Sequence, residues 1–385
     1  MQLDAFASTA LEELRKAGLF RQLRPVAGAQ GPLIVVDGRE VVNFSSNDYL
    51  GLANDPVLRE AAARALEHHG VGAGASRLVC GNLAPYAELE ARLAAFKRKP
   101  AAVVFSSGYA AGVGAISALV GKGDTVILDK LDHASLVDGA RLSGATIRVY
   151  PHGNLEKLEK LLQSERAGRT LVVTETVFSM DGDVAPLREI VQLKDRYGAW
   201  LMIDEAHATG LYGKQRRGVA EDLGVEDRVD ATLGTLSKAF GCVGGFVCGS
   251  RPLVDLLVNR ARSLIYSTAL PPAMVAAAGA AVEFVTGAAG QKRCEELWRR
   301  VDDLKTGMER LGFKSVPRGA IMPMLVGDEV RAVDCSRRLF DSGFFAPAIR
   351  YPTVARGAAR LRLTVTASHT SEQIKSLLRV LPAPV

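Results

Sequence analysis

The sequence predicts an α/β protein with a mostly parallel seven-stranded sheet in a large domain and a smaller α+β domain. Its length of 385 residues exceeds what one hydrophobic core usually serves. Between about residues 100 and 250, short β-branched runs alternate with helical stretches. After Arg251 the pattern changes to long helices followed by two strand-like segments, which indicates a second domain.

The large sheet is predicted from seven short segments, several of them apolar nearly throughout, as in LVVTET and WLMIDEA. Such runs are typical of parallel strands whose two faces are both covered. Helices such as 187–197 supply the crossovers between strands. The expected strands are 101–106, 125–129, 146–150, 170–176, 200–204, 231–236 and 245–248.

The domain boundaries follow from where these patterns change. Residues 1–45 form an N-terminal helix and extension, which we expect to pack with the small domain or against a neighbouring subunit. Residues 46–290 form the large domain. The small C-terminal domain, 291–385, is expected to hold strands at 321–326 and 361–365 and a last helix at 371–381.

Composition and charge exclude several classes of protein. Hydrophobic residues make up 48% of the chain, with 38 Gly and 16 Pro, which is typical of a globular protein with many tight turns. The formal charge of +6 arises from scattered basic residues without a continuous stripe, so a nucleic-acid arm is not expected. The excess of positive charge leaves room for an anionic substrate such as a phosphorylated carrier.

Cysteine use and the apolar runs favour a cytoplasmic location. The five cysteines are irregularly spaced and contain no Cys-x-x-Cys pair, which argues against a zinc site and a disulfide framework. Met1 to Glu13 lacks the apolar run of a signal peptide. No uncharged stretch is expected to span a membrane, and the small-residue run 271–281 is shorter than the about 20 residues needed and is typical of a packed helix.

Three motifs resemble sites of other protein classes. Asp204-Glu205-Ala206-His207 spells a helicase box, but the phosphate loop that such proteins need is missing upstream. The glycine-rich segment 70–75 resembles a dinucleotide fingerprint, yet it follows a helix instead of a strand, which favours a flexible substrate-facing loop. His68 with His69, and His133 with Asp132, lack a third metal ligand, so no metal is expected.

Two residues suggest a site for pyridoxal phosphate (PLP). Carbanion chemistry on that cofactor needs an imine-forming lysine and a carboxylate for the ring nitrogen. Lys238, in TLSKAFG, follows a predicted strand, and Asp204 ends the apolar strand WLMID. Both belong to the edge where α/β sheets bind ligands. An ordinary surface lysine and a helix-capping carboxylate are the alternatives.

A phosphate cradle is predicted where the strand AAVVF meets a helix. Ser107, Gly108 and Tyr109 open that helix, so backbone N–H groups and a hydroxyl face an anion there. Thr235 adds a hydroxyl from a neighbouring strand end. Many strand-turn-helix joints have this composition, so the prediction depends on the other candidate residues that are expected nearby.

Three further side chains follow predicted strands. His133 is a candidate to stack on the cofactor ring, and the alternative is a helix N-terminal residue near solvent. His207 and Ser179 are candidates to hydrogen-bond the phenolic oxygen of the cofactor. The shared location of these residues strengthens the cofactor assignment.

The sequence resembles the α-oxoamine synthases, a family of PLP enzymes, over nearly its whole length. The matching pieces, in order, are NFSSNDYLGL at 43–52, FSSGYAAG at 105–112, DHASLVDG at 132–139, TETVFSMDGD at 174–183, IDEAHATGLYG at 203–213, TLSKAFG at 235–241 and RYPTVARGAARLRLTVTASHT at 350–370. The resemblance implies a fold-type-I homodimer with PLP at the junction of domains and subunits.

The family's residue roles carry over to matching positions. Lys238 is implied as imine lysine and proton shuttle, Asp204 as partner of the pyridine nitrogen, and His133 as the group over the ring and near substrate. His207 and Glu175 complete the implied catalytic set, with the role of Glu175 least defined. The implied cofactor-binding residues are Ser107, Gly108, Tyr109, His133, Ser179, Asp204, His207, Thr235 and Lys238, and the implied substrate residues are Arg21, Asn47, His133, Thr353 and Arg362.

The implied reaction joins L-alanine to a pimeloyl thioester, on coenzyme A or a carrier protein, with release of carbon dioxide and free thiol. SSNDYLGL and RYPTV favour this member of the family. Arg77, Cys80 and Asn82 occupy positions that vary among relatives with other acyl donors. The alternatives are another α-oxoamine synthase, such as one forming 2-amino-3-ketobutyrate from glycine, or an aminotransferase.

Overall fold

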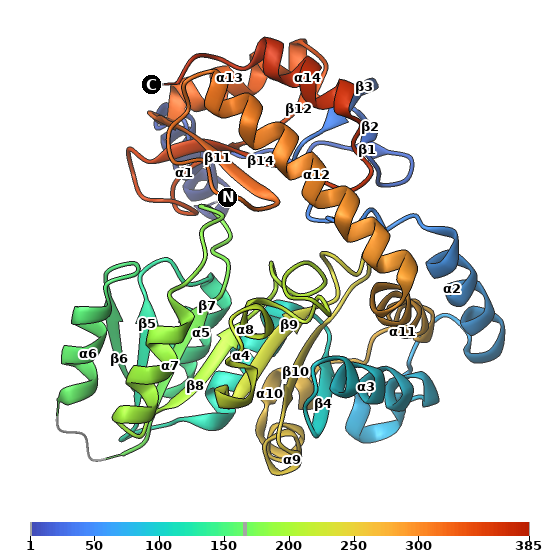
Figure 1. Cartoon of the computed structure of the whole chain (residues 1–385), viewed down its shortest axis with the longest axis vertical. Helices are drawn as coiled ribbons and strands as arrows, with labels where there is room; N and C mark the ends of the chain where they lie inside the picture. Colours follow the sequence, from blue (N-terminus) through green and yellow to red (C-terminus); the bar gives the residue numbers. More distant parts are fainter. Residues whose placement is uncertain (1, 165–167, 385) are drawn as a thin grey trace. The chain divides into compact units, whose positions relative to one another are not determined.

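The computed structural model of this chain describes residues 2–164 and 168–384 (Figure 1). The chain divides into two compact units. The larger unit contains 52–179 and 183–294, and the smaller unit contains the described parts of 1–51, 180–182 and 295–385.

A seven-stranded sheet forms the centre of the larger unit, as the sequence predicts. Its spatial order is β4-β10-β9-β8-β7-β5-β6. Six strands run in one direction, and β10 runs antiparallel to both of its neighbours. The strands are β4 (Ala101–Phe105), β5 (Thr125–Asp129), β6 (Thr146–Tyr150), β7 (Thr170–Glu175), β8 (Trp200–Asp204), β9 (Ala231–Thr235) and β10 (Gly245–Gly249).

Helices cover both faces of this sheet, which explains the apolar strands. In β5, Val126 and Leu128 join an apolar cluster with residues of α4, α5 and α9, whereas Ile127 joins a second cluster with residues of α6 and α7. Alternate side chains point to opposite faces of a strand, so both faces of β5 are buried. The helices of this unit are α2 (Pro56–His69), the π-helix η1 (Arg77–Gly81), α3 (Ala84–Phe96), α4 (Gly108–Leu119), α5 (Ala134–Ser143), α6 (Leu155–Gln163), α7 (Leu187–Arg196), α8 (Val219–Asp222), the 3-10 helix η2 (Glu226–Arg228), α9 (Arg251–Arg260), α10 (Arg262–Ile265) and α11 (Pro272–Thr286).

The smaller unit joins the two ends of the chain. Its first sheet has the order β1-β2-β3-β12, with β12 parallel to β3, so segments some 300 residues apart share one sheet. Its second sheet has the order β11-β14-β13 and is antiparallel. The elements are α1 (Gln2–Lys16), β1 (Val26–Ala27), β2 (Leu33–Val36), β3 (Arg39–Asn43), β11 (Ile321–Gly327), α13 (Glu329–Asp341), β12 (Phe344–Phe345), β13 (Ala348–Ile349), β14 (Ala359–Thr364) and α14 (Ser371–Val380).

One long helix, α12 (Ala288–Arg310), contains the point at which the chain passes from one unit to the other. Among the described helices, no single one is long and apolar enough to cross a membrane. Taken together, α11 and α12 meet the length and composition test for a membrane span, but the pair is bent by 75° at its break.

Candidate active site

Four strand ends of the larger unit carry the central residues. β9, β8, β7 and β5 are consecutive in the sheet and end at Thr235, Asp204, Glu175 and Asp129. Glu175 and Asp204 are register partners on β7 and β8. Because these strands are parallel, their last residues emerge at one edge, where α/β proteins bind ligands.

Lys238 follows β9 by three residues and is half-buried. Its Nζ lies 2.8 Å from Nε2 of His207. The turn before it is fixed because Thr235 Oγ1 accepts the Ser237 N–H at 3.2 Å and donates to the Gly244 carbonyl at 2.9 Å. The amine therefore lies at the sheet edge beside an imidazole.

Asp204 is buried, with 6% of its surface exposed. One carboxylate oxygen accepts the Ala206 N–H at 2.8 Å within a turn. The next described helix, α8, begins at Val219, so Asp204 does not form the helix cap that is the alternative interpretation. Burial raises the pKa of Asp204, while the charges of Lys238 and His133 lower it. The ionisation of this carboxylate therefore depends on neighbouring cations.

Glu175, at the end of β7, is a buried acid with one oxygen that has no partner in the described ranges. It is 2% exposed, and its Oε1 has no hydrogen-bond partner among the described residues. Burial, followed by the charge of Asp204, raises its pKa to about 8. Asp132, which accepts the Glu175 N–H at 2.9 Å, is also buried, and burial raises its pKa well above the ordinary range. At neutral pH a carboxyl group with a pKa near 8 is mostly protonated.

His133 precedes α5 and caps it. Its Nδ1 accepts the Ser135 N–H at 3.3 Å and lies 2.8 Å from the Ser135 hydroxyl. Accepting that N–H requires a lone pair on Nδ1, so the ring proton of the neutral form lies on Nε2. The residue is exposed, although the surrounding protein removes enough water to lower its pKa. His133 is therefore both a helix cap and a member of the site.

Ser107, Gly108 and Thr235 meet where β10 begins. Ser107 is the N-cap of α4 and accepts the Ala110 N–H at 3.0 Å. A Cβ on Gly108 would lie 3.3 Å from the Thr235 side chain, and one on Gly245 would lie 2.5 Å from the Ser107 carbonyl oxygen. The backbone approach at Gly245 therefore requires glycine. This arrangement places an α-helix N-terminus beside a hydroxyl, which suits a phosphate.

Two other cofactor candidates differ in burial. Tyr109 is 49% exposed, and its hydroxyl donates to Asp138 at 2.7 Å. Ser179 is buried in the loop between β7 and α7, four residues after Glu175. The Phe178 N–H in this loop donates to the Asp183 carbonyl oxygen at 3.0 Å.

His152, which sequence reasoning missed, ties this loop to the sheet. Its Nδ1 lies 3.0 Å from Asp129 Oδ1 and its Nε2 lies 2.8 Å from Asp183 Oδ2. These two carboxylates raise the pKa of His152 to about 10. Its ring also meets the edge of Phe178 at a centroid distance of 4.4 Å. Its position two residues after β6 is a signal that could have identified it.

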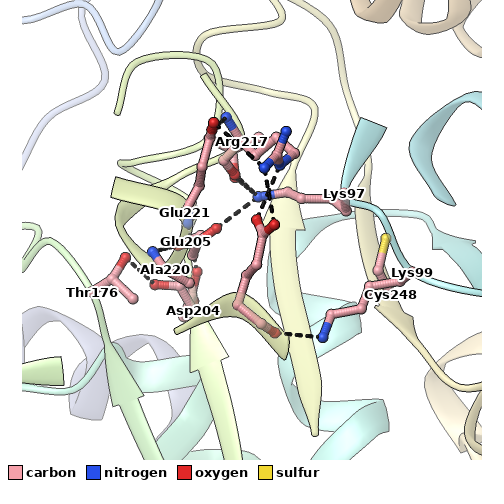
Figure 2. Close-up of polar contacts among 12 residues, drawn as sticks. Lys97, Lys99, Thr176, Asp204, Glu205, Arg217, Ala220, Glu221 and Cys248 are labelled. Carbon is pink, nitrogen blue, oxygen red and sulfur yellow. Dashed lines mark hydrogen bonds and ion pairs between the residues drawn. The ribbon is translucent and has the colours of Figure 1, made fainter. Parts of the chain in front are cut away.

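A buried ion pair, Lys97 with Glu205, lies beside Asp204 and was also missed (Figure 2). Nζ of Lys97 lies 2.7 Å from Glu205 Oε2, and the two side chains are 3% and 2% exposed. Glu205 follows Asp204 directly in the sequence. The Lys-Arg-Lys run at 97–99 reads as an exposed helix end, so sequence alone gave no signal for this pair.

The four other substrate candidates lie in the smaller unit. Arg362, on β14, is buried and donates to Asn47 Oδ1 at 3.1 Å, and the Tyr49 hydroxyl lies 3.2 Å from the same oxygen. Arg21 donates to the Tyr351 carbonyl at 2.7 Å, two residues before Thr353. The structure thus brings Asn47 to Arg362, and Arg21 to the segment of Thr353.

The motifs that resemble sites of other protein classes do not have the structural surroundings that those sites need. Residues 70–75 follow α2 and precede η1, without the strand of a dinucleotide fold. Glu205 and His207 of the helicase-like box contact Lys97 and Lys238. In the described ranges, no group of three His, Cys, Asp or Glu side chains is placed to hold a metal.

The residues of the larger unit fit PLP. They provide an amine at Lys238, a buried carboxylate at Asp204, and an α-helix N-terminus beside the Thr235 hydroxyl for a phosphate. Asp204 suits a cationic ring nitrogen, because burial disfavours its charge unless a cation is near.

Comparisons with known proteins agree with this fit. The family model described as aminotransferase class I and II matches residues 39–381. The 8-amino-7-oxononanoate synthase of Geotalea daltonii is 49% identical over 367 residues, covering 94% of this chain and 93% of that protein. A serine palmitoyltransferase from S. paucimobilis, solved with bound PLP, superposes with a TM-score of 0.92 at 33% identity, covering 97% of this chain and 95% of that chain. The 8-amino-7-oxononanoate synthase of Francisella tularensis gives a TM-score of 0.77 at 27% identity, covering 89% and 96%.

Proposed function

Because the chain belongs to the class I and II aminotransferase family and, within it, to the α-oxoamine synthases, we propose that it is a PLP-dependent acyltransferase of biotin biosynthesis. It condenses L-alanine with pimeloyl-CoA, or with pimeloyl-carrier protein, to 8-amino-7-oxononanoate, carbon dioxide and free thiol. The observation that carries this proposal is the meeting of Lys238, His207 and Asp204 at one sheet edge, in a chain 49% identical to a named 8-amino-7-oxononanoate synthase.

Each proposed cofactor contact follows from the chemistry of the residue. Lys238 Nζ would form the covalent link, and the buried Asp204 carboxylate would pair with the ring nitrogen. The N-terminus of α4 at Ser107, Gly108 and Tyr109, with the Thr235 hydroxyl, would hold the phosphate. Ser179 and His207 would bind the phenolic oxygen, and His133 would lie near the ring.

The bound cofactor supplies an electron sink for the Cα carbanion of the amino acid. Lys238 Nζ takes the Cα proton and later returns a proton, and His207 Nε2, 2.8 Å away in this structure, holds the amine in place. Glu175, with its unpartnered Oε1 and a pKa of about 8, retains a proton near the site at neutral pH. Arg21, Asn47, Thr353 and Arg362 are the candidates for substrate contacts that the family resemblance implies.

We further propose that the enzyme is a cytoplasmic homodimer. Several large apolar side chains are exposed and are candidates for contacts with a second subunit, among them Leu3 (74%), Phe6 (72%), Val71 (78%) and Val79 (78%). None of the five cysteines, all of which lie in the described ranges, forms a disulfide, which suits a reducing compartment. Light scattering of the purified protein tests the dimer, and a monomeric mass at micromolar concentration would contradict it.

A turnover panel tests the proposed reaction. Alanine, glycine and serine are each paired with pimeloyl, acetyl, succinyl and palmitoyl thioesters, and free thiol, carbon dioxide and amino ketone are measured. Alanine with the pimeloyl thioester should give the highest kcat/KM. Preference for glycine with acetyl-CoA, or conversion of a 2-oxo acid to an amino acid without thiol release, would contradict the proposal.

A further inference from the structure

Asp204 and Glu205 are consecutive buried carboxylates with different surroundings. Burial raises the pKa of Asp204, and the charges of Lys238 and His133 lower it, whereas Glu205 binds Lys97 (Figure 2). An uncompensated charge on Glu205 would oppose ionisation of Asp204, because like charges a few ångströms apart raise each other's pKa.

The Lys97 ammonium uses all three of its donors. It donates to Glu205 Oε2 at 2.7 Å, to Thr209 Oγ1 at 2.8 Å and to the Arg217 carbonyl oxygen. On the other side, Glu205 Oε1 accepts the Ala220 N–H at 2.9 Å. Such complete pairing is what makes a buried ion pair tolerable.

Lys97 also holds the turn that carries His207. The Glu205 carbonyl accepts the N–H groups of Ala208 at 3.0 Å and Thr209 at 2.8 Å, which closes the turn. Lys97 contacts side chains at both ends of this turn, Glu205 and Thr209. His207, between them, reaches Lys238 at 2.8 Å.

The charge balance around Asp204 involves groups from several elements. Burial raises the pKa of Asp204, the charge of Glu205 raises it further, and the cations lower it. The titratable groups that face this part of the sheet edge are Lys238 after β9, His133 before α5, Glu175 at the end of β7, and Glu205 and His207 after β8.

We propose that Lys97 is a positioning residue, which neutralises Glu205 and fixes the 205–209 turn so that Asp204 stays charged and His207 stays aligned with Lys238. Lys97 acts on the site through Glu205 and through the turn. Both its charge and its packing should therefore influence the ionisation of Asp204 and the position of His207. The proposal rests on the PLP assignment made above.

The first test is the pH dependence of PLP affinity, because only the charged form of Asp204 pairs with the ring nitrogen. In Lys97→Met, the acidic midpoint at which affinity is lost should rise by about one pH unit or more. In Glu205→Gln, which leaves the Lys97 cation beside Asp204, the midpoint should fall. In the double variant, with the pair neutral, it should return to within about 0.3 of the parental value.

Lys99→Met is the matched control. Lys99 donates to two backbone carbonyls, of Glu226 at 2.7 Å and Val229 at 3.0 Å, in the same segment of chain. Its replacement should lower the melting temperature without moving the midpoint. A parental midpoint in Lys97→Met, or a double variant that keeps the shift of Lys97→Met, would overturn the charge role. If Lys97→Met does not fold, an unchanged or raised midpoint in Glu205→Gln would overturn it.

A measurement without cofactor separates this proposal from the PLP assignment. The Asp204 carboxyl carbon is followed by 13C NMR in the cofactor-free protein, with Asp204→Asn for its assignment. Its titration should move to higher pH in Lys97→Met and to lower pH in Glu205→Gln. If the midpoint of the Asp204 titration is the same in both variants as in the parent, the proposal is refuted even if PLP binds. Failure of PLP to bind would refute the cofactor assignment alone.

Discussion

Two lysines beside the same turn illustrate the difference between a reactive region and a structural one. Lys97 is buried, and its ammonium binds a carboxylate, a hydroxyl and a carbonyl. Lys238 is half-buried and lies 2.8 Å from an imidazole nitrogen. A lysine whose three donors bind a carboxylate, a hydroxyl and a carbonyl has a structural role, whereas Lys238 lies beside an imidazole, a group suited to proton transfer.

The same contrast separates two histidines and two acids. His152 is clamped by two carboxylates, whereas His207 faces a lysine. Glu205 binds a cation and an N–H group, whereas Glu175 has an oxygen without a partner among the described residues. The structural clusters pair ionic groups of opposite charge, whereas the acids of the reactive region, Asp204 and Glu175, have pKa values raised chiefly by burial.

Removal of the reactive lysine should have the largest effect. Lys238→Ala should reduce turnover by about 1,000-fold or more, because covalent attachment and proton transfer are both lost. Steady-state assays of thiol release measure this loss. The exposed Lys130→Ala serves as control and should keep parental activity. Activity within tenfold of the parent in Lys238→Ala would remove Lys238 from the chemistry.

Neutralising Asp204 should have the next largest effect on turnover. Asp204→Asn keeps the shape of the side chain but cannot hold a ring cation, so turnover should fall by about 100-fold or more. PLP affinity, measured by fluorescence titration, should weaken as well. Equal turnover in Asp204→Asn and the parent would show that Asp204 has no role in the chemistry.

The structural histidine should affect stability in a pH-dependent way. His152 has a pKa of about 10 in the folded protein, above its ordinary value of 6.5, so its contribution is complete below pH 6.5 and is lost as pH rises toward 10. His152→Gln should lower the free energy of unfolding by about 2 kcal/mol at pH 6. Urea unfolding at pH 6 and pH 10 measures the difference, which should shrink at pH 10. A loss of unfolding free energy that is the same at pH 6 and pH 10 would contradict the pairing of His152 with two carboxylates. Replacement of the exposed His68 by Gln is the control.

Glu175 should destabilise the folded protein as pH rises, whereas His152 stabilises it at low pH. Its pKa of about 8 exceeds the ordinary 4.5, so the folded protein loses stability as pH rises from 4.5 to 8, where only the unfolded chain ionises readily. Glu175→Gln should therefore raise the unfolding free energy by about 1 kcal/mol more at pH 8 than at pH 5. Denaturation curves of the two proteins measure this difference. A difference in unfolding free energy that is the same at pH 5 and pH 8 would contradict the raised pKa of Glu175.

Much of the fold could be predicted because its strands are covered on both faces. Segments such as WLMID are apolar on both faces, and their ends mark the edge where Asp204 and Lys238 lie. The antiparallel direction of β10 could not be predicted, since Gly245–Gly249 is fully buried and would look the same in either direction. The sharing of one sheet by β3 and β12 depends on contacts between distant segments.

The residues that support the site were harder to find than those that form it. Lys97 and Glu205 are separated by 108 positions, and nothing local to either indicates the other. Lys97 begins a run of three basic residues that resembles a solvated helix end, yet its side chain is 3% exposed. Burial of a charged residue depends on tertiary packing, which no local pattern encodes.

Lys238, and not another lysine, should carry the cofactor. The protein loaded with PLP is reduced with borohydride, which makes the link between lysine and cofactor permanent, and its peptides are identified by mass spectrometry. The pyridoxyl group should be found on the peptide that contains Lys238 and should be absent from peptides that contain Lys97. Modification of a different lysine, or no modification of a protein saturated with PLP, would contradict it.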